Sequence, residues 1–172
     1  MIQISDTAAQ AIADHARRTY PDECVGLLLG TLSPPTADAT NGLETGVSMQ
    51  IRAVYPVENR WEGQITLADS DDPTSRRDRF YLDPRDYLRA DRAASQQGLD
   101  VIGCYHSHPD SPATPSERDR VGAQGVGSGT QFAFLIQSVY ATAAADLRGW
   151  FLRDNGARFA ETALAVTPTP DA

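Results

Sequence analysis

Apolar residues near the start of the chain recur at helical spacing. After a short β-prone segment at 2–4, Ser5 precedes a stripe of residues that would share one helix face: Ala8, Ile12, Ala16 and Tyr20. Ser5 has the side chain of a good N-cap, and Pro21 lacks the N–H that a continuing helix needs. The pattern therefore predicts a helix from Ser5 to about Tyr20.

Continuous apolar runs predict the strands. Residues 24–29 form such a run between a proline and a glycine, which is typical of a strand buried on both faces. Further β-prone segments follow at 50–57, 101–105, 131–139, 147–153 and 158–164. Residues 31–49 lack a regular pattern, contain several Pro and Gly residues, and predict a connector.

Capping signals predict two more helices. Asp83, followed directly by a proline, begins a helix that Gly98 ends. Further along, Thr114 would cap a helix with Pro115 at its first position and Glu117 closing a capping box. Helices beside a nearly continuous set of strands predict an α/β domain with one mixed β-sheet flanked by helices.

Length and gaps in the patterning predict the domain organisation. At 172 residues and 18.6 kDa the chain suits one domain. We expect this domain over residues 1–165 and a flexible tail at 166–172. Residues 58–80 form a polar insertion, rich in Asp, Ser and Arg. A disordered surface insertion is the favoured interpretation, and a flap that orders over bound substrate is the alternative.

Charge and composition exclude some functions. The 15 basic residues, all arginines, against 23 acidic ones give a net charge of −8, which argues against nucleic acid as the main partner because that binding requires phosphate neutralisation. No apolar run approaches the ~20 residues of a membrane span, and the first residues lack the features of a signal peptide. We therefore expect a cytoplasmic protein without a membrane partner. Cys24 and Cys104 are expected to be reduced thiols in core strands rather than a disulfide.

The candidate chemistry lies at the end of the 101–105 strand. His106 and His108 are two positions apart, so both side chains of an extended chain point to the same face. Asp119 would follow in the first turns of the third helix. Two imidazoles and a carboxylate suit Zn²⁺ with an open fourth position, as in catalytic zinc sites, although other divalent metals also bind such a set. The alternative is that the histidines are surface residues and Asp119 is a solvated helix charge.

These residues resemble the JAMM signature of the MPN-domain zinc metalloproteases. The matching positions are His106, His108, Ser116 and Asp119, with ten residues between His108 and Asp119. A second segment, residues 20–30 with Glu23, resembles the upstream glutamate motif of the same family, and the resemblance extends to about Leu164. It implies a single MPN-type, cytidine-deaminase-like domain of the compact bacterial kind, with the three signature ligands holding zinc.

The resemblance also implies the roles of two further residues. Glu23 would take a proton from the zinc-bound water and pass it to the departing amine, and Ser116 would donate a hydrogen bond to the oxyanion. Judged by their neighbours alone, Glu23 would be a surface charge beside a buried strand, and Ser116 would satisfy a local backbone group. The resemblance favours the catalytic roles.

The expected substrate also follows from the resemblance. It implies hydrolysis of a peptide or isopeptide bond after the C-terminal Gly-Gly of a ubiquitin-like sulfur-carrier protein, whose extended tail can thread a narrow groove. The main alternative is a non-catalytic MPN scaffold that binds partners. A zinc deaminase would need a Pro-Cys-x-x-Cys ligand pair that the sequence lacks, and the acidic balance counts against a DNA-repair relative.

Overall fold

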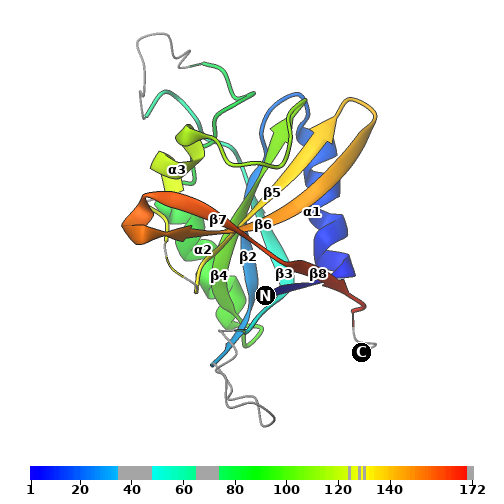
Figure 1. Ribbon diagram of the computed structural model, residues 1–172, viewed down its shortest axis with the longest axis vertical. Coiled ribbons are helices and arrows are strands. Elements are labelled where there is room, and N and C mark those ends of the chain that lie inside the picture. Colours follow the sequence, from blue (N-terminus) through cyan, green and yellow to red (C-terminus); the bar gives the residue numbers. More distant parts are fainter. Residues whose placement is uncertain (35–47, 65–73, 124, 128, 130, 170–172) are drawn as a thin grey trace.

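The strands form one curled mixed sheet. The computed structural model describes residues 1–34, 48–64, 74–123, 125–127, 129 and 131–169. Their strands are β1 (Ile2–Ser5), β2 (Val25–Ser33), β3 (Ser48–Val57), β4 (Asp100–Pro109), β5 (Ala133–Tyr140), β6 (Ala143–Arg153), β7 (Arg158–Thr162) and β8 (Leu164–Thr167). They follow the order β7-β6-β5-β4-β2-β3-β1-β8 (Figure 1). β1 runs parallel to β3 and β8, and β4 parallel to β5, whereas the other neighbours are antiparallel, so the predicted mixed sheet is confirmed.

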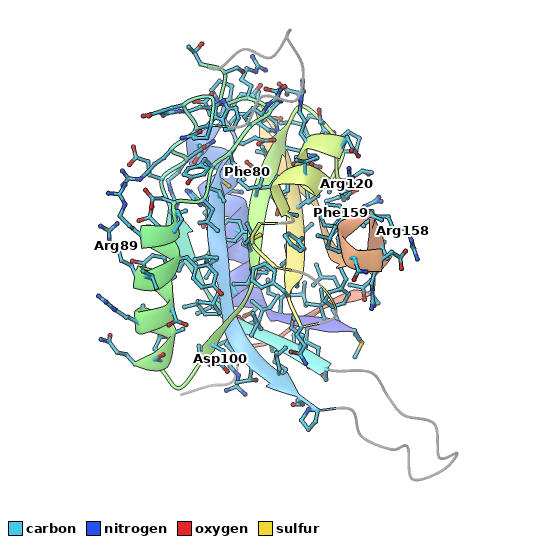
Figure 2. All side chains as sticks on the ribbon, turned by 90° about the vertical axis from the view of Figure 1, so that its left-hand side faces the viewer. Phe80, Arg89, Asp100, Arg120, Arg158 and Phe159 are labelled. Atoms are coloured by element: carbon cyan, nitrogen blue, oxygen red, sulfur yellow. The ribbon has the colours of Figure 1, made fainter. Side chains whose placement is uncertain are left out.

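Helices cover both faces of the sheet. α1 (Asp6–Thr19) packs on one face, and α2 (Pro84–Ser95) and α3 (Glu117–Ala123) lie on the other. In Figure 2, α2 and α3 stand in front of the sheet and α1 stands behind it. Among the described residues, no helix combines the length and apolar character that crossing a membrane requires.

The first two helices begin where the capping signals predicted. Ser5 Oγ accepts a hydrogen bond from the Ala8 N–H at 3.2 Å, and Asp83 Oδ1 accepts one from the Arg85 N–H at 2.8 Å. Each side chain satisfies a backbone N–H that the first turn of a helix leaves without a partner. These local contacts explain why both helix starts could be predicted.

Strand alternation divides the core into two parts. Side chains that pack towards α1 include Leu28, Tyr105 and Leu135, whereas their neighbours Leu27, Cys104 and Ile136 pack towards α2 and α3. Because alternate residues of a strand point to opposite faces, the predicted apolar runs are buried on both sides. Cys104 lies on the α2/α3 face, so His106 and His108, at two and four positions further along β4, face the same side.

The third helix begins later than predicted. α3 starts at Glu117, because Ser116 Oγ accepts a hydrogen bond from the Asp119 N–H at 3.1 Å and Asp119 Oδ2 accepts one from the Ser116 N–H at 2.6 Å. This reciprocal pair closes the first turn. The predicted capping box of Thr114 and Glu117 is therefore wrong, and the box lies two residues further along.

Several other features differ from the predictions. β2 extends to Ser33 and β3 begins at Ser48, so both ends of the predicted connector are strand, and the single strand predicted at 158–164 is divided between β7 and β8. β4 continues to Pro109, so both histidines lie inside the strand rather than beyond it. β8 includes residues 166–167, which the sequence pattern assigns to the tail. Within the polar insertion, Asn59, Trp61 and Arg79 are buried, so its described ends pack onto the domain instead of forming a disordered surface segment. Positions 35–47 of the connector, 65–73 of the insertion and 170–172 of the tail lie outside the described residues.

Candidate metal centre

His106, His108 and Asp119 meet on the α2/α3 face of the sheet, and all three are buried. The Nε2 atoms of the two histidines lie 3.0 Å apart. Asp119 Oδ1 lies 3.2 Å from His106 Nε2, and Asp119 Oδ2 lies 3.3 Å from His108 Nε2. The structure therefore brings together the three residues that we predicted as ligands.

The spacing of these donor atoms fits a small tetrahedral cation. Zinc bonds of about 2.0–2.2 Å place tetrahedral ligand atoms about 3.3–3.6 Å apart. The two Nε2 atoms are 3.0 Å apart, each lies 3.2 or 3.3 Å from one of the two Asp119 oxygens, and one ligand atom from each residue lies within 4.8 Å of the others. These separations are close to what one bound ion requires. Two imidazole nitrogens and one carboxylate are also donors that zinc prefers, and three protein ligands leave one position open. The residues present therefore fit a catalytic zinc ion.

Backbone and aromatic contacts orient the two imidazoles. His108 Nδ1 lies 2.8 Å from the carbonyl oxygen of Pro112, which can only accept a hydrogen bond. Nδ1 of His108 therefore carries a proton, which leaves Nε2 as the nitrogen that faces the centre and could ligate a metal. The ring of Phe80 stacks on His106, with ring centroids 4.5 Å apart and planes 29° apart. Phe80 therefore covers one face of this imidazole.

The charges at the centre suit metal ligation. Burial alone would raise the pKa of Asp119, but its contacts with His106 and His108 hold that pKa well below its usual range. Burial lowers the pKa of His106, and Asp119 offsets this only in part. Burial also opposes protonation of His108, but the hydrogen bond and charge of Asp119 outweigh it and raise the pKa of His108. An anionic Asp119 and a neutral His106 are the protonation states that bind a metal ion.

Glu23 is a buried carboxyl group beside the centre. It lines one pocket together with His108 and Ser116. Its side chain is 4% exposed, and within the described part of the chain its Oε2 has no hydrogen-bond partner. Burial, aided by the negative charges of Asp119 and Asp78, raises the pKa of Glu23 well above its ordinary 4.5. The interpretation of Glu23 as a surface charge does not agree with this burial.

The hydroxyl of Ser116 accepts one hydrogen bond within the protein and can still donate another. Its Oγ accepts the Asp119 N–H, which is the local backbone role that we considered for it. A hydroxyl that accepts a hydrogen bond can still donate its own proton. Ser116 lines the pocket that also contains Glu23 and His108.

A second pocket adjoins Asp119 on the side of the insertion. Its lining is mainly apolar and includes Trp61, Phe80, Leu82 and Val126. The sequence patterns did not single out Phe80 or the Pro112 carbonyl, because an isolated aromatic residue and a backbone carbonyl carry no local signal. The proximity of Phe80 to His106 follows from the path of the insertion over the sheet.

Comparison with known proteins identifies the family. Residues 5–153 match the model of a family described as prokaryotic homologs of the JAB domain. The match covers most of the chain, so the chain belongs to this family. This finding confirms the predicted family and the MPN-type fold.

Two named relatives match part of the chain. A probable TtuB-protein conjugate cleaving protease from Thermus thermophilus is 45% identical over 105 residues, which are 61% of this chain and 51% of that protein. A desampylase from Pyrococcus furiosus is 42% identical over 43 residues, which are 25% of this chain and 31% of that protein. The chain thus matches about half of the length of the first relative and less of the second.

Two solved structures resemble the whole chain. A protein from Salinibacter ruber is 30% identical, with a TM-score of 0.59, covering 100% of this chain and 94% of its own. A protein from Desulfitobacterium hafniense has a TM-score of 0.68 at 24% identity, covering 98% of this chain and 94% of its own. At 24% identity, the similarity to the Desulfitobacterium hafniense protein shows the fold alone.

Proposed function

We propose that the chain is a zinc-dependent isopeptidase. It hydrolyses the peptide or isopeptide bond after the C-terminal Gly-Gly of a ubiquitin-like sulfur-carrier protein. The observation that carries this proposal is the convergence of His106 Nε2, His108 Nε2 and the Asp119 carboxylate at the spacing of zinc ligands. Membership of the JAB family and the names of the two relatives support it.

The three converging side chains would hold the zinc ion. When bound, the ion would polarise the carbonyl under attack and lower the pKa of a coordinated water. The Pro112 carbonyl keeps the His108 ring in the ligating tautomer, and the Ser116 N–H orients the Asp119 carboxylate. Partners of this kind raise ligand basicity and reduce the freedom of the site.

Glu23 transfers the proton. A departing amine must be protonated, because an amide nitrogen is a poor leaving group as an anion. A carboxyl whose pKa is raised well above its usual value by burial can hold a proton near neutral pH and release it again. Glu23 therefore accepts the proton of the attacking water and delivers it to the leaving nitrogen.

Ser116 stabilises the charge that develops on the carbonyl oxygen. Its hydroxyl proton remains available while the Asp119 N–H occupies one of its lone pairs. Loss of a comparable oxyanion donor in other hydrolases lowers kcat by about 10²–10³. Ser116 is therefore the chain's own contribution to transition-state stabilisation.

The shape of the site suits an extended tail. One pocket contains Glu23 and Ser116, and the apolar pocket adjoins it at Asp78 and Arg118, which line both. A Gly-Gly segment has no side chains to obstruct passage between Phe80 and the α3 region, and preceding apolar side chains can occupy the apolar pocket. The relatives named for cleaving TtuB-protein conjugates and for desampylation support a substrate of this class.

The test is cleavage of a defined conjugate. Zinc-loaded protein is incubated with a ubiquitin-like sulfur carrier whose C-terminal Gly-Gly is joined to a lysine-containing peptide, and the products are analysed by mass spectrometry. We expect cleavage directly after Gly-Gly, loss of cleavage on chelation, and recovery when zinc is restored. A matched substrate ending in Gly-Val serves as the control for the tail. Zinc binding without cleavage of Gly-Gly carriers would contradict the proposal and favour a partner-binding scaffold.

A further inference from the structure

The backbone of Glu23 is held by the insertion rather than by the sheet. Its N–H donates to the carbonyl oxygen of Arg76 at 2.7 Å, and its own carbonyl accepts a hydrogen bond from Asn59 Nδ2 at 2.9 Å. The next residue pairs differently, since Cys24 N–H donates to Ser107 Oγ at 2.8 Å and Cys24 O accepts from the Ser107 N–H at 3.1 Å. Glu23 thus stands just outside the strand ladder, and both of its peptide groups bond to residues of the insertion.

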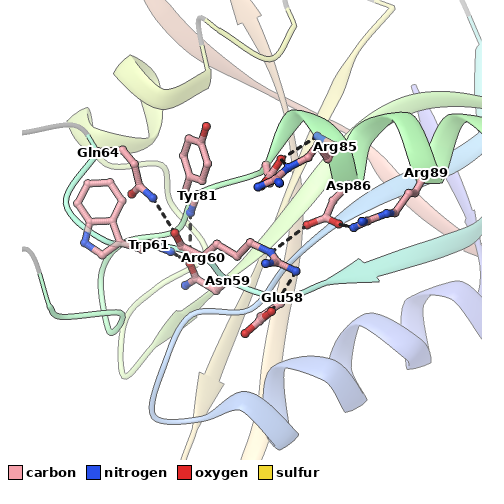
Figure 3. Close-up of polar contacts among 10 residues, drawn as sticks. Glu58, Asn59, Arg60, Trp61, Gln64, Tyr81, Arg85, Asp86 and Arg89 are labelled. Atoms are coloured by element: carbon pink, nitrogen blue, oxygen red, sulfur yellow. Dashed lines mark hydrogen bonds and ion pairs between the residues drawn. The ribbon is translucent and has the colours of Figure 1, made fainter.

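Asn59 connects the two ends of the insertion to Glu23. Besides its bond to the Glu23 carbonyl, Nδ2 donates to the carbonyl oxygen of Arg79 at 2.8 Å. Asn59 Oδ1 accepts from the Trp61 N–H at 3.1 Å and from the Tyr81 N–H at 3.2 Å (Figure 3). The side chain is 8% exposed and uses both donors and both lone pairs of its amide. A buried amide with all four bonds made holds its partners in one arrangement.

The same segment also contacts the metal centre and α3. Phe80 stacks on His106, as described above. Asp78 forms an ion pair with Arg118 of α3, with Oδ2 and Nη1 2.9 Å apart. The insertion therefore touches the candidate base, one candidate ligand and the helix that carries another, and Asn59 lies where its two ends meet.

We propose that Asn59 is a positioning residue for Glu23. By fixing the Glu23 carbonyl and both ends of the insertion, it sets the point from which the Glu23 side chain reaches into the site. The catalytic consequence rests on the proposed function, whereas the effect on the Glu23 backbone does not. The test is designed to separate the two.

Three variants isolate the contribution of Asn59. Asn59→Ala removes all four bonds, and Asn59→Asp keeps an acceptor for Trp61 and Tyr81 but cannot donate to Glu23. The matched control is Gln64→Ala. Gln64 is another amide of the insertion, and among the described residues its bonds are local: it donates to Arg60 O at 2.7 Å (Figure 3) and accepts from the Glu62 N–H at 2.8 Å.

The first measurement is amide hydrogen exchange by NMR on the metal-free protein. We expect the Glu23 amide to exchange about fivefold to tenfold faster in both Asn59 variants, because without the bond from Asn59 to its carbonyl the Glu23 backbone opens its N–H contact with Arg76 more often. The amides of residues 27–29 in β2 should keep their wild-type protection. Gln64→Ala should match wild type throughout.

The second measurement is turnover of the Gly-Gly conjugate by zinc-loaded protein. Because misplacement of a catalytic group by about 1 Å can cost about 100-fold in rate, we expect kcat to fall by about 10- to 100-fold in both Asn59 variants. Zinc content and KM should stay near the wild-type values, since neither ligands nor pockets are removed.

Several outcomes would overturn the proposal. Wild-type exchange at Glu23 in Asn59→Asp would show that the donated bond does not hold the base. Equal loss of protection at residues 27–29, or loss of the cooperative thermal transition in both Asn59 variants, would assign Asn59 to the stability of the whole domain. If wild-type protein cleaves no conjugate, the proposed function fails, and the exchange measurement still decides whether Asn59 holds Glu23.

Discussion

His108 Nδ1 lies 2.8 Å from the carbonyl oxygen of Pro112. Because a carbonyl only accepts, the ring donates from Nδ1 and points Nε2 towards Asp119 and His106. Pro112 belongs to the loop between β4 and α3, so this loop determines the tautomer of a residue on the strand. A histidine whose second nitrogen donates to a backbone carbonyl is a usual arrangement around zinc.

The first prediction concerns the metal ligands. Wild-type protein purified without a polyhistidine tag should contain about one zinc per chain, and His108→Ala and Asp119→Ala should each lose it, because two remaining ligands hold zinc weakly. Mass spectrometry of the metal content measures this. His15→Gln is the control, since His15 bonds to the Tyr105 hydroxyl at 2.9 Å instead of facing the centre. A His108→Ala protein with its full zinc content would refute the ligand assignment.

The second prediction concerns Glu23 and pH. Burial raises the pKa of Glu23 above its unfolded value, so its contribution to stability is complete below pH 4.5 and is lost as pH rises through the folded pKa. At pH 8, metal-free Glu23→Gln should therefore melt several degrees above the wild type, since each kcal/mol of unfolding free energy raises the melting temperature by about 2–4 °C. Near pH 4 the melting temperatures of the two proteins should not differ for this reason. The zinc-loaded variant should keep its metal and lose turnover.

Glu117→Gln is the control for this pH effect. A hydrogen bond from Arg120 lowers the pKa of the exposed Glu117 carboxylate, which is the opposite direction, so this variant should gain no thermal stability at pH 8. Calorimetry at both pH values makes the comparison. Retained turnover in zinc-loaded Glu23→Gln would remove Glu23 from the mechanism.

The third prediction separates the two roles of Ser116. Ser116→Ala loses the cap on α3, which should cost about 1 kcal/mol of unfolding free energy, and loses the oxyanion donor, which should lower kcat by about 10²–10³. Zinc should remain, because the backbone N–H of residue 116 still bonds to Asp119. Ser111→Ala changes a serine of the same pocket and should leave kcat unchanged. A loss of stability without a loss of kcat would restrict Ser116 to capping.

The fourth prediction tests whether a cysteine thiol takes part in the reaction. Burial raises the pKa of Cys24 to about 12 and also raises the pKa of Cys104, so almost no thiolate exists at neutral pH. Both thiols should react with a disulfide reagent far more slowly in the native protein than in denaturant, and Cys24→Ser should retain most of the activity. Rapid labelling of native protein, or inactive but folded Cys24→Ser, would be evidence against the metal-based proposal.

Local patterns were enough to predict much of the structure. The caps at Ser5 and Asp83 involve contacts with the next two or three residues, and the buried strands follow from short apolar runs. The common orientation of His106 and His108 also follows from strand alternation alone. Each of these features depends on residues within a few positions of one another, so the sequence by itself determined them.

The tertiary structure decided how these pieces form a site. Asp119 reaches the two histidines because α3 folds back over β4, and the Asp119 carboxylate itself helps to form the first turn of α3. Glu23 lies near the histidines because β2 pairs with β4, which places Val25 opposite His106. The place of the insertion depends on contacts of Asn59 and Phe80 with segments distant in the chain. Such contacts form only when the whole chain packs, and they have no periodic signature, so the packed sheet was needed to reveal them.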